Sequence, residues 1–147
     1  MGVINALAPP ATLNGGWEDV LEGGAGRFAY ETASDSTGRN LDVLRHADFT
    51  ADKWDVTITV EAIDTTVSGG ALSGGKAFNS DLAAAVDAAH LGVHHAVLFT
   101  PDSGTLSGKT FMIVDLNGIA GYQASQDLVV QLSAPQHLAS LDIGDFI

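Results

Sequence analysis

The sequence predicts a mainly β fold of one domain, with a single α-helix near residues 79–91 packed on a sheet. Glycine is abundant, at 17 of 147 residues, and it clusters where turns are expected. Residues 55–60, DVTITV, alternate β-branched and polar side chains, as a strand does. Residues 79–91 have a helical periodicity instead. A chain of this length can bury one core.

The charge of the chain limits its partners. Eighteen acidic residues against six basic ones give a net charge of −12. A basic surface, which nucleic acid and anionic lipid both require, is not expected, and no segment is long enough to span a bilayer. The sequence has no cysteine, so it offers neither disulfides nor thiolate metal ligands. The surplus of carboxylates suits an extracellular protein or a binder of hard cations such as calcium.

The first 13 residues form an apolar segment that contains Pro9 and Pro10. We expect residues 1–13 to be an N-terminal arm, which either covers the protein's own core or docks on a neighbouring copy. No basic residues precede its apolar patch, so it does not resemble a cleaved signal peptide. Residues 14–147 are then expected to form the single β-rich domain.

Two glycine clusters lie about nine residues apart in residues 14–26, NGGWEDVLEGGAG. Repeated glycines permit tight turns, and a carboxylate between such turns can bind a cation together with backbone carbonyls. This is the pattern of the parallel β-roll, whose repeat is GGxGxDxUx. Asp19 and Leu21 occupy its acidic and apolar positions, whereas the second copy has Arg27 and Phe28 where its aspartate is due. Because a roll needs several stacked repeats, we expect only a β-roll remnant beside a β-sandwich-like sheet.

The strands expected in order begin with Phe28–Tyr30 and residues 55–60. Further strands are expected at residues 94–100, 109–115 and 127–132, the last two paired as a hairpin. The helix follows a glycine-rich and serine-rich loop. Asn79 or Ser80 can cap this helix, and Gly92 is expected to end it.

The connection of this hairpin is rich in oxygen donors. Asp115 and Asn117 alternate, so both side chains can turn into one loop, and Asp127 can close it from the returning strand. Gly118 and Gly121 permit sharp turns. We predict a calcium site with Asp115, Asn117 and Asp127 as ligands. A loop stabilised by Asn and Asp side-chain turns explains the same residues without an ion.

A second acidic group precedes the helix, and its members are Asp42, Asp48, Asp52 and Asp55. They are further candidate calcium ligands. Residues 31–64 hold eight acidic and three basic residues, so a solvated acidic face is the alternative.

Catalytic chemistry is not predicted. His90 and His94 have the spacing of a zinc-binding helix, and His95 follows them, but Leu91 stands where that motif has its glutamate. No GxSxG elbow, P-loop or dinucleotide fingerprint occurs. We therefore expect no enzyme, with a small hydrolase as the least favoured reading.

The order of several motifs resembles a known family. GGAGRFAYETASDSTG at residues 23–38, LDVL at 41–44 and DFTADKWDV at 48–56 resemble the segment after the last calcium repeats of serralysin-like and other repeats-in-toxin proteins. HAVLFT at 95–100, followed by GYQA and the final DFI, is similar to the bluetail-type C-terminal domain of large bacterial surface proteins.

This resemblance implies secretion by type I machinery, with an uncleaved C-terminal signal and folding upon extracellular calcium. Asp19 would occupy the ligand position of the repeat. The second acidic group would occupy the acidic positions that follow the repeats in this family. Asp145, Phe146 and Ile147 would be the terminal signal, whose removal should stop export and leave the core mostly intact. The repeat array is nearly absent here, which departs from the family.

The function expected is that of a non-catalytic, secreted, calcium-associated surface module. The alternative is a self-assembling structural subunit of a surface layer, filament or virion decoration that associates through residues 1–13.

Overall fold

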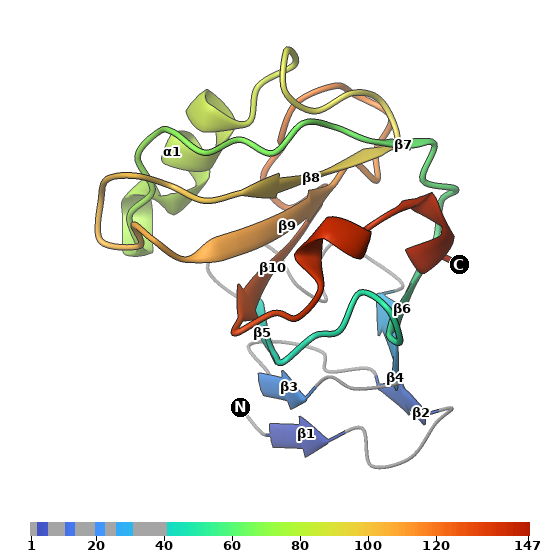
Figure 1. Ribbon diagram of the computed structural model, residues 1–147. Coiled ribbons are helices and arrows are strands. Elements are labelled where there is room, and N and C mark those ends of the chain that lie inside the picture. The colour runs from blue at the N-terminus through green and yellow to red at the C-terminus, as the bar shows by residue number, and fades with distance from the viewer. Residues whose placement is uncertain (1–2, 6–10, 14–19, 23–25, 31–40) are drawn as a thin grey trace.

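The computed structural model describes the chain at residues 3–5, 11–13, 20–22, 26–30 and 41–147 (Figure 1). Its side chains are described for residues 27–30 and 41–147. The protein is mainly β, with two sheets and one short α-helix, as the sequence predicts. Within the described residues, no helix is long and apolar enough to cross a membrane.

Ten strands and one α-helix make up the described fold. They are β1 (Val3–Asn5), β2 (Ala11–Leu13), β3 (Val20–Glu22), β4 (Gly26–Tyr30), β5 (Asp42–Arg45), β6 (Lys53–Val56), β7 (Ala62–Ile63), α1 (Phe78–Ala85), β8 (His95–Phe99), β9 (Thr110–Val114) and β10 (Leu128–Ser133). Short 3₁₀ helices lie at Gly75–Ala77, Leu138–Ser140 and Ile143–Asp145. The large sheet has the order β1-β3-β5-β10-β9-β8-β7, and the small sheet has the order β2-β4-β6.

The first six strands alternate between the two sheets. β1, β3 and β5 pair in parallel in the large sheet, and β2, β4 and β6 pair in parallel in the small one. The first three strands begin at residues 3, 11 and 20, so the chain changes sheet after eight and then nine residues. A chain that winds in this way is a parallel roll. The sequence predicts a roll remnant at residues 14–26, and the winding in the structure extends from β1 to β6.

The predicted arm contains β1 and β2, the outermost strands of the two sheets. They pair with β3 and β4, and so form the first winding of the roll. The rest of the arm lies outside the described residues. So do most of the two glycine clusters and Asp19.

β10 joins the roll to an antiparallel unit. On one side it pairs in parallel with β5, and on the other it forms the predicted antiparallel hairpin with β9, in which Val129 lies opposite Ile113. β8 continues the antiparallel arrangement with Val97 opposite Ile113. The large sheet is therefore continuous from the first winding to β7.

Both faces of the antiparallel unit are covered, which explains why its strands are apolar runs rather than alternating sequences. On one face, Leu98, Met112 and Val130 pack with aromatic residues of the small sheet. On the other face, side chains such as Ile113 pack with residues of α1. In Figure 1, α1 lies on the opposite side of this unit from the small sheet.

The predicted helix at residues 79–91 is too long, since α1 ends at Ala85. Val86 leaves the helical region, with φ −111° and ψ 67°. Its carbonyl accepts a hydrogen bond of 2.9 Å from the Tyr122 N–H instead of continuing the helix. The helix follows Ala77, which makes no side-chain cap, and neither Asn79 nor Ser80 caps it. A contact with a distant loop therefore decides where this helix stops.

The predicted strand at residues 55–60 is also misplaced, because β6 ends at Val56. Val56 is opposite Tyr30, the last residue of β4, so the described part of the small sheet offers no partner strand beyond Val56. The alternating residues that follow Val56 therefore have no neighbouring strand among the described residues. Strand propensity without a partner does not make a strand.

Candidate functional site

Asp115 and Asp127 flank the connection between β9 and β10. The last residues in register are Val114 and Leu128, so the two aspartates form the next pair across the hairpin. Both side chains are fully buried, with no exposed surface. Two carboxyl groups are thereby held side by side in the protein interior. Burying two negative charges together costs free energy, and this cost must be offset by hydrogen bonds, by protonation or by a positive charge.

Backbone N–H groups supply part of that compensation. The Oδ1 and Oδ2 atoms of Asp127 accept hydrogen bonds from the N–H groups of Leu116 at 3.0 Å and Gln123 at 2.7 Å. The Oδ2 atom of Asp115 accepts one from the His94 N–H at 2.7 Å. The Oδ1 atom of Asp115 is buried and receives no hydrogen bond from an N–H or hydroxyl group of the described residues, and the Asp115 carboxyl is hydrogen-bonded to that of Asp127.

The electrostatics of the pair oppose a double negative charge. The pKa of Asp127 is raised to about 7, mainly by burial. The N–H groups of Gln123 and Leu116 lower this pKa, whereas the neighbouring, hydrogen-bonded Asp115 carboxyl raises it. The pair therefore keeps one proton up to about neutral pH. If that proton is absent, another positive charge must take the proton's place between the two carboxyl groups.

Asn117 is placed differently from its two predicted partners. Its Oδ1 atom accepts a hydrogen bond from the Ile119 N–H at 3.0 Å, and its Nδ2 atom donates to Gln126 at 3.1 Å. These bonds define a side-chain turn within the connection. Asn117 therefore shapes the loop, as the alternative to a calcium ligand predicts, while Asp115 and Asp127 meet.

Gln123 is a residue of this site that the sequence does not single out. Its N–H donates to Asp127, and its side-chain Nε2 donates to the Ala120 carbonyl at 3.1 Å. Its Oε1 atom is buried without a hydrogen-bond partner among the described residues. A glutamine in a polar loop carries no distinctive signal, so only the folded loop shows that this oxygen is enclosed.

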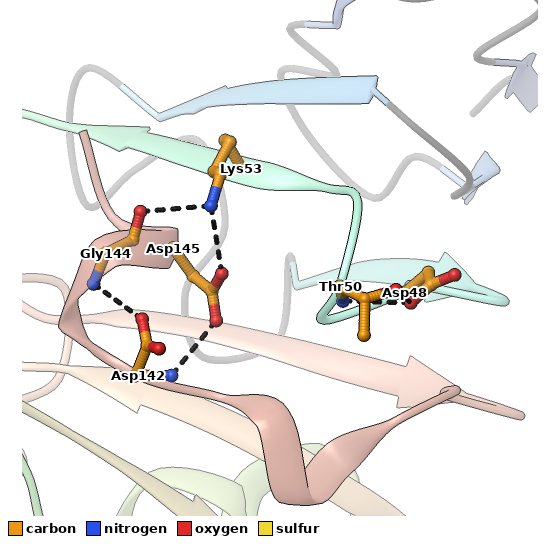
Figure 2. Close-up of polar contacts among 6 residues, drawn as sticks. All are labelled: Asp48, Thr50, Lys53, Asp142, Gly144 and Asp145. Carbon is orange, nitrogen blue, oxygen red and sulfur yellow. Dashed lines mark hydrogen bonds and ion pairs between the residues drawn. The ribbon is translucent and has the colours of Figure 1, made fainter.

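The second acidic group is divided between several places. Asp48 accepts hydrogen bonds through Oδ1 from the N–H of Thr50 at 2.9 Å and from its hydroxyl at 2.7 Å, and Figure 2 shows this turn. The Thr50 hydroxyl, the Thr50 N–H and then His137 lower the pKa of Asp48 to about 2. Asp52 accepts from the Asp48 N–H at 2.8 Å. These contacts close a turn.

The remaining two members belong to different sheets. Asp42 lies in β5 and is fully buried, whereas Asp55 lies in β6 and forms an ion pair with Arg27 of β4. Among the residues that the structure describes, no three histidine, aspartate or glutamate side chains are grouped to hold a metal ion. Metal binding by this group stays a prediction.

The three candidate histidines engage separate groups. The Nδ1 atom of His90 lies 2.7 Å from Asp87, and that of His95 lies 2.9 Å from Asp64. His94 contributes its backbone N–H to Asp115. Each histidine therefore contacts a different carboxylate.

The C-terminal segment is part of the folded core. Asp142 and Asp145 form a reciprocal capping box around the last 3₁₀ helix. Lys53 of β6 bonds to the Asp145 carboxylate and the Gly144 carbonyl, both at 3.2 Å, as Figure 2 shows. The Asp145 side chain is nearly fully buried at 3% exposure.

The last two residues extend the small sheet. The Ile147 N–H donates to the Trp54 carbonyl at 2.8 Å, and the Val56 N–H donates to the Ile147 carbonyl at 3.3 Å. Phe146 is 9% exposed and packs against Trp54. The expectation that the final three residues can be removed with little effect on the core is therefore wrong. Only Ile147, at 50% exposure, presents its side chain to solvent.

The fold and site thus define a mainly β protein in which a parallel roll continues into an antiparallel sheet, with a buried carboxyl pair in its last hairpin. Comparison with known proteins found no matching family model, no similar curated protein and no similar solved structure.

Proposed function

We propose that this protein is a non-catalytic, calcium-associated surface module of the repeats-in-toxin type. It is exported by type I secretion machinery, and residues 145–147 are its export signal. The observation that carries this proposal is the alternation of β1 to β6 between two parallel sheets, at an initial spacing of eight and nine residues. Calcium-binding rolls are built on such a winding.

The buried carboxyl pair adds support. Asp115 has an enclosed oxygen without a donor among the described residues, and Asp127 lies beside it. Both would hold a hard cation through oxygen ligands, as calcium prefers. A bound cation would stabilise the hairpin by neutralising the two carboxylates.

Calcium titration tests the cation requirement. The purified chain would be melted with excess chelator and with calcium at increasing concentrations, followed by circular dichroism. Binding to the native state raises the melting temperature with calcium concentration, because ligands stabilise the state that they bind. An unchanged melting curve across this series would contradict calcium association.

Export is tested with substitutions that spare the fold. Ile147 and Ile143 are both 50% exposed, so each can become serine with little loss of packing. If the last residues are the signal, Ile147→Ser reduces the amount of protein secreted by cells that carry type I machinery. Ile143→Ser is the matched control and should be secreted normally. Equal secretion of both variants at the level of the unaltered chain would count against the signal.

The alternative function is a self-assembling subunit, and one observation favours it. Among the described strands, β1 and β2 are the edges of the two sheets at the same end of the roll. Strand edges can pair with another chain. Mass photometry across a concentration series tests this, because assembly gives masses that are multiples of the chain's mass. A monomer at every concentration would exclude it.

A further inference from the structure

We propose that two copies of this chain associate by exchanging residues 136–147, each copy docking this exchange segment on the other. The acceptor is formed by residues 47–56, on which the exchange segment of the same chain lies in the monomer. The product is a closed two-fold dimer. This association is separate from pairing through residues 1–13, and it depends on neither calcium nor export.

The exchange segment makes a self-contained set of contacts. Its hydrogen bonds and ring contacts with other described segments all reach the acceptor. At its start, the Gln136 N–H donates to the Ala47 carbonyl at 2.7 Å, and the Gln136 carbonyl accepts from the Phe49 N–H at 3.2 Å. Because one stretch of chain supplies every partner, the acceptor of another copy can make the same contacts with unchanged geometry.

The far end of the exchange segment provides the strongest anchor. Phe146 is 9% exposed, and its ring lies 6.2 Å from that of Trp54. The Ile147 N–H donates to the Trp54 carbonyl at 2.8 Å, and the Ile147 carbonyl accepts from the Val56 N–H at 3.3 Å. Figure 2 shows the acceptor strand beside this end of the chain. A buried ring together with main-chain pairing is a mode by which extended peptides bind to a sheet edge, so this docking suits an intermolecular partner.

The connector between β10 and the exchange segment carries backbone strain. Ala134 has a φ of +48°, in the left-handed region that a Cβ disfavours. Ala134 also precedes Pro135, and a residue before proline favours an extended backbone. The monomer keeps this conformation because the chain must turn here to reach its own acceptor. In the exchanged dimer Ala134 is free to extend, and the strain is released.

The balance between the two forms follows from these contacts. The docking contacts are the same in monomer and dimer, so the strain at Ala134 favours exchange, whereas the loss of translational freedom opposes it. The dimer is therefore favoured by high protein concentration. Interconversion requires the buried Phe146 ring to leave Trp54, so a dimer that has formed should persist after dilution.

The first experiment refolds the whole chain from urea at a series of concentrations. Size-exclusion chromatography with light scattering then measures the masses, and a dimer is expected to increase with concentration. For the second experiment, isotope-labelled and unlabelled chains are mixed before refolding, and the dimer is isolated. Isotope-filtered NMR should detect a cross-peak between the Phe146 ring of one chain and the Trp54 ring of the other.

A pair of variants tests the connector. Ala134→Gly should weaken the dimer by at least about tenfold in apparent dissociation constant, because glycine adopts a positive φ without strain and the monomer is then relieved. Ala139→Gly is the matched control, since this alanine is also exposed but lies in the 3₁₀ helix at Leu138–Ser140. Its dimer should be as stable as that of the unaltered chain.

The outcomes are distinct. A monomer at every refolding concentration overturns the proposal, as does a dimer without the cross-peak between chains. Equal dissociation constants for Ala134→Gly and Ala139→Gly overturn it as well, because the connector then contributes nothing to exchange. Should Ala134→Gly fail to fold, the isotope-filtered measurement on the unaltered chain decides the question. A chain that binds no calcium or is not exported leaves this inference intact, because none of these measurements depends on either property.

Discussion

The ring of Phe146 lies 6.2 Å from the ring of Trp54, so the penultimate residue of the chain is anchored on β6. Trp54 also stacks on Phe49 at 4.9 Å and contacts Phe28 at 5.7 Å. The chain end thereby completes an aromatic cluster to which β4, β6 and the turn at Phe49 contribute. This contact makes the C-terminus a structural element of the small sheet.

Phe146→Ala is expected to destabilise the protein by about 3 kcal/mol, because it removes a buried ring from this cluster and leaves a cavity. Ile147→Ala should cost less than about 1 kcal/mol, since that side chain is half exposed and the backbone pairing with Trp54 is kept. Urea unfolding of the two variants measures both values. Equal destabilisation would mean that packing of the ring on Trp54 contributes little.

The carboxyl pair predicts an acid-stabilised hairpin in the absence of calcium. The pKa of Asp127 is raised to about 7 from 3.8, so the native state binds its proton more tightly than the unfolded state. Its contribution to stability is complete below about pH 4 and is lost as pH rises to about 7. The loss is on the order of a few kcal/mol.

Asp115→Asn should remove most of this pH dependence. The amide oxygen can still accept from the His94 N–H, and its NH₂ group provides a donor beside Asp127, which then ionises at little cost. In chelator, the variant is expected to be more stable than the unaltered chain at pH 8, and this gain should shrink toward pH 4. Denaturation series at several pH values measure it. A constant difference would show that the two carboxyls are not linked.

Two glycines with similar backbones should respond differently to alanine. Gly104 and Gly108 have φ values of +86° and +81°. A Cβ on Gly104 would lie 2.3 Å from the Leu72 carbonyl oxygen, whereas one on Gly108 would meet nothing within 4 Å. Gly108→Ala should cost about 1 kcal/mol from the left-handed backbone alone. Gly104→Ala should cost more, since the loop that carries Leu72 must move. Thermal melts of both variants decide this comparison.

The hydroxyl of Tyr122 donates a hydrogen bond of 2.7 Å to the Asn79 side chain, which links the hairpin connection to α1. Tyr122→Phe and Asn79→Ala should each reduce stability by about 1 kcal/mol. Because they remove the same bond, the double variant should lose less than the sum of the two. A double-mutant cycle measured by chemical denaturation tests this coupling. Strict additivity would show that the bond contributes no stability.

Local sequence patterns predicted the antiparallel unit well. The apolar runs that became β8, β9 and β10 were located to within about one residue at each end, and the pairing of the last two as a hairpin is confirmed. Such strands are set by composition and by nearby turns, which a sequence displays directly. The mainly β class also followed from the sequence, whereas the winding of β1 to β6 extends beyond residues 14–26, where the glycine spacing predicts a roll remnant.

The candidate site was predicted in part. The sequence predicts that Asp115 and Asp127 are partners, and the structure brings them together. The Asn117 side chain instead stabilises the turn, and the side-chain oxygen of Gln123 is buried beside the pair. Which side chain of a loop points inward depends on φ and ψ values set by the closed hairpin. Alternation of residue types does not contain that information.

The sequence by itself determined the fold class, the hairpin and the acidic character of the chain, because these depend on residues close together along it. Only the tertiary structure decided the parallel pairing of β5 with β10, the early end of α1 at Val86 and the docking of Phe146 on Trp54. The docking of Phe146 on Trp54 joins distant parts of the chain. The neighbouring contact between Lys53 and Asp145 does so too, and these residues are 92 positions apart. Contacts of this kind form when distant apolar surfaces exclude water together, and no local periodicity records which surfaces will meet.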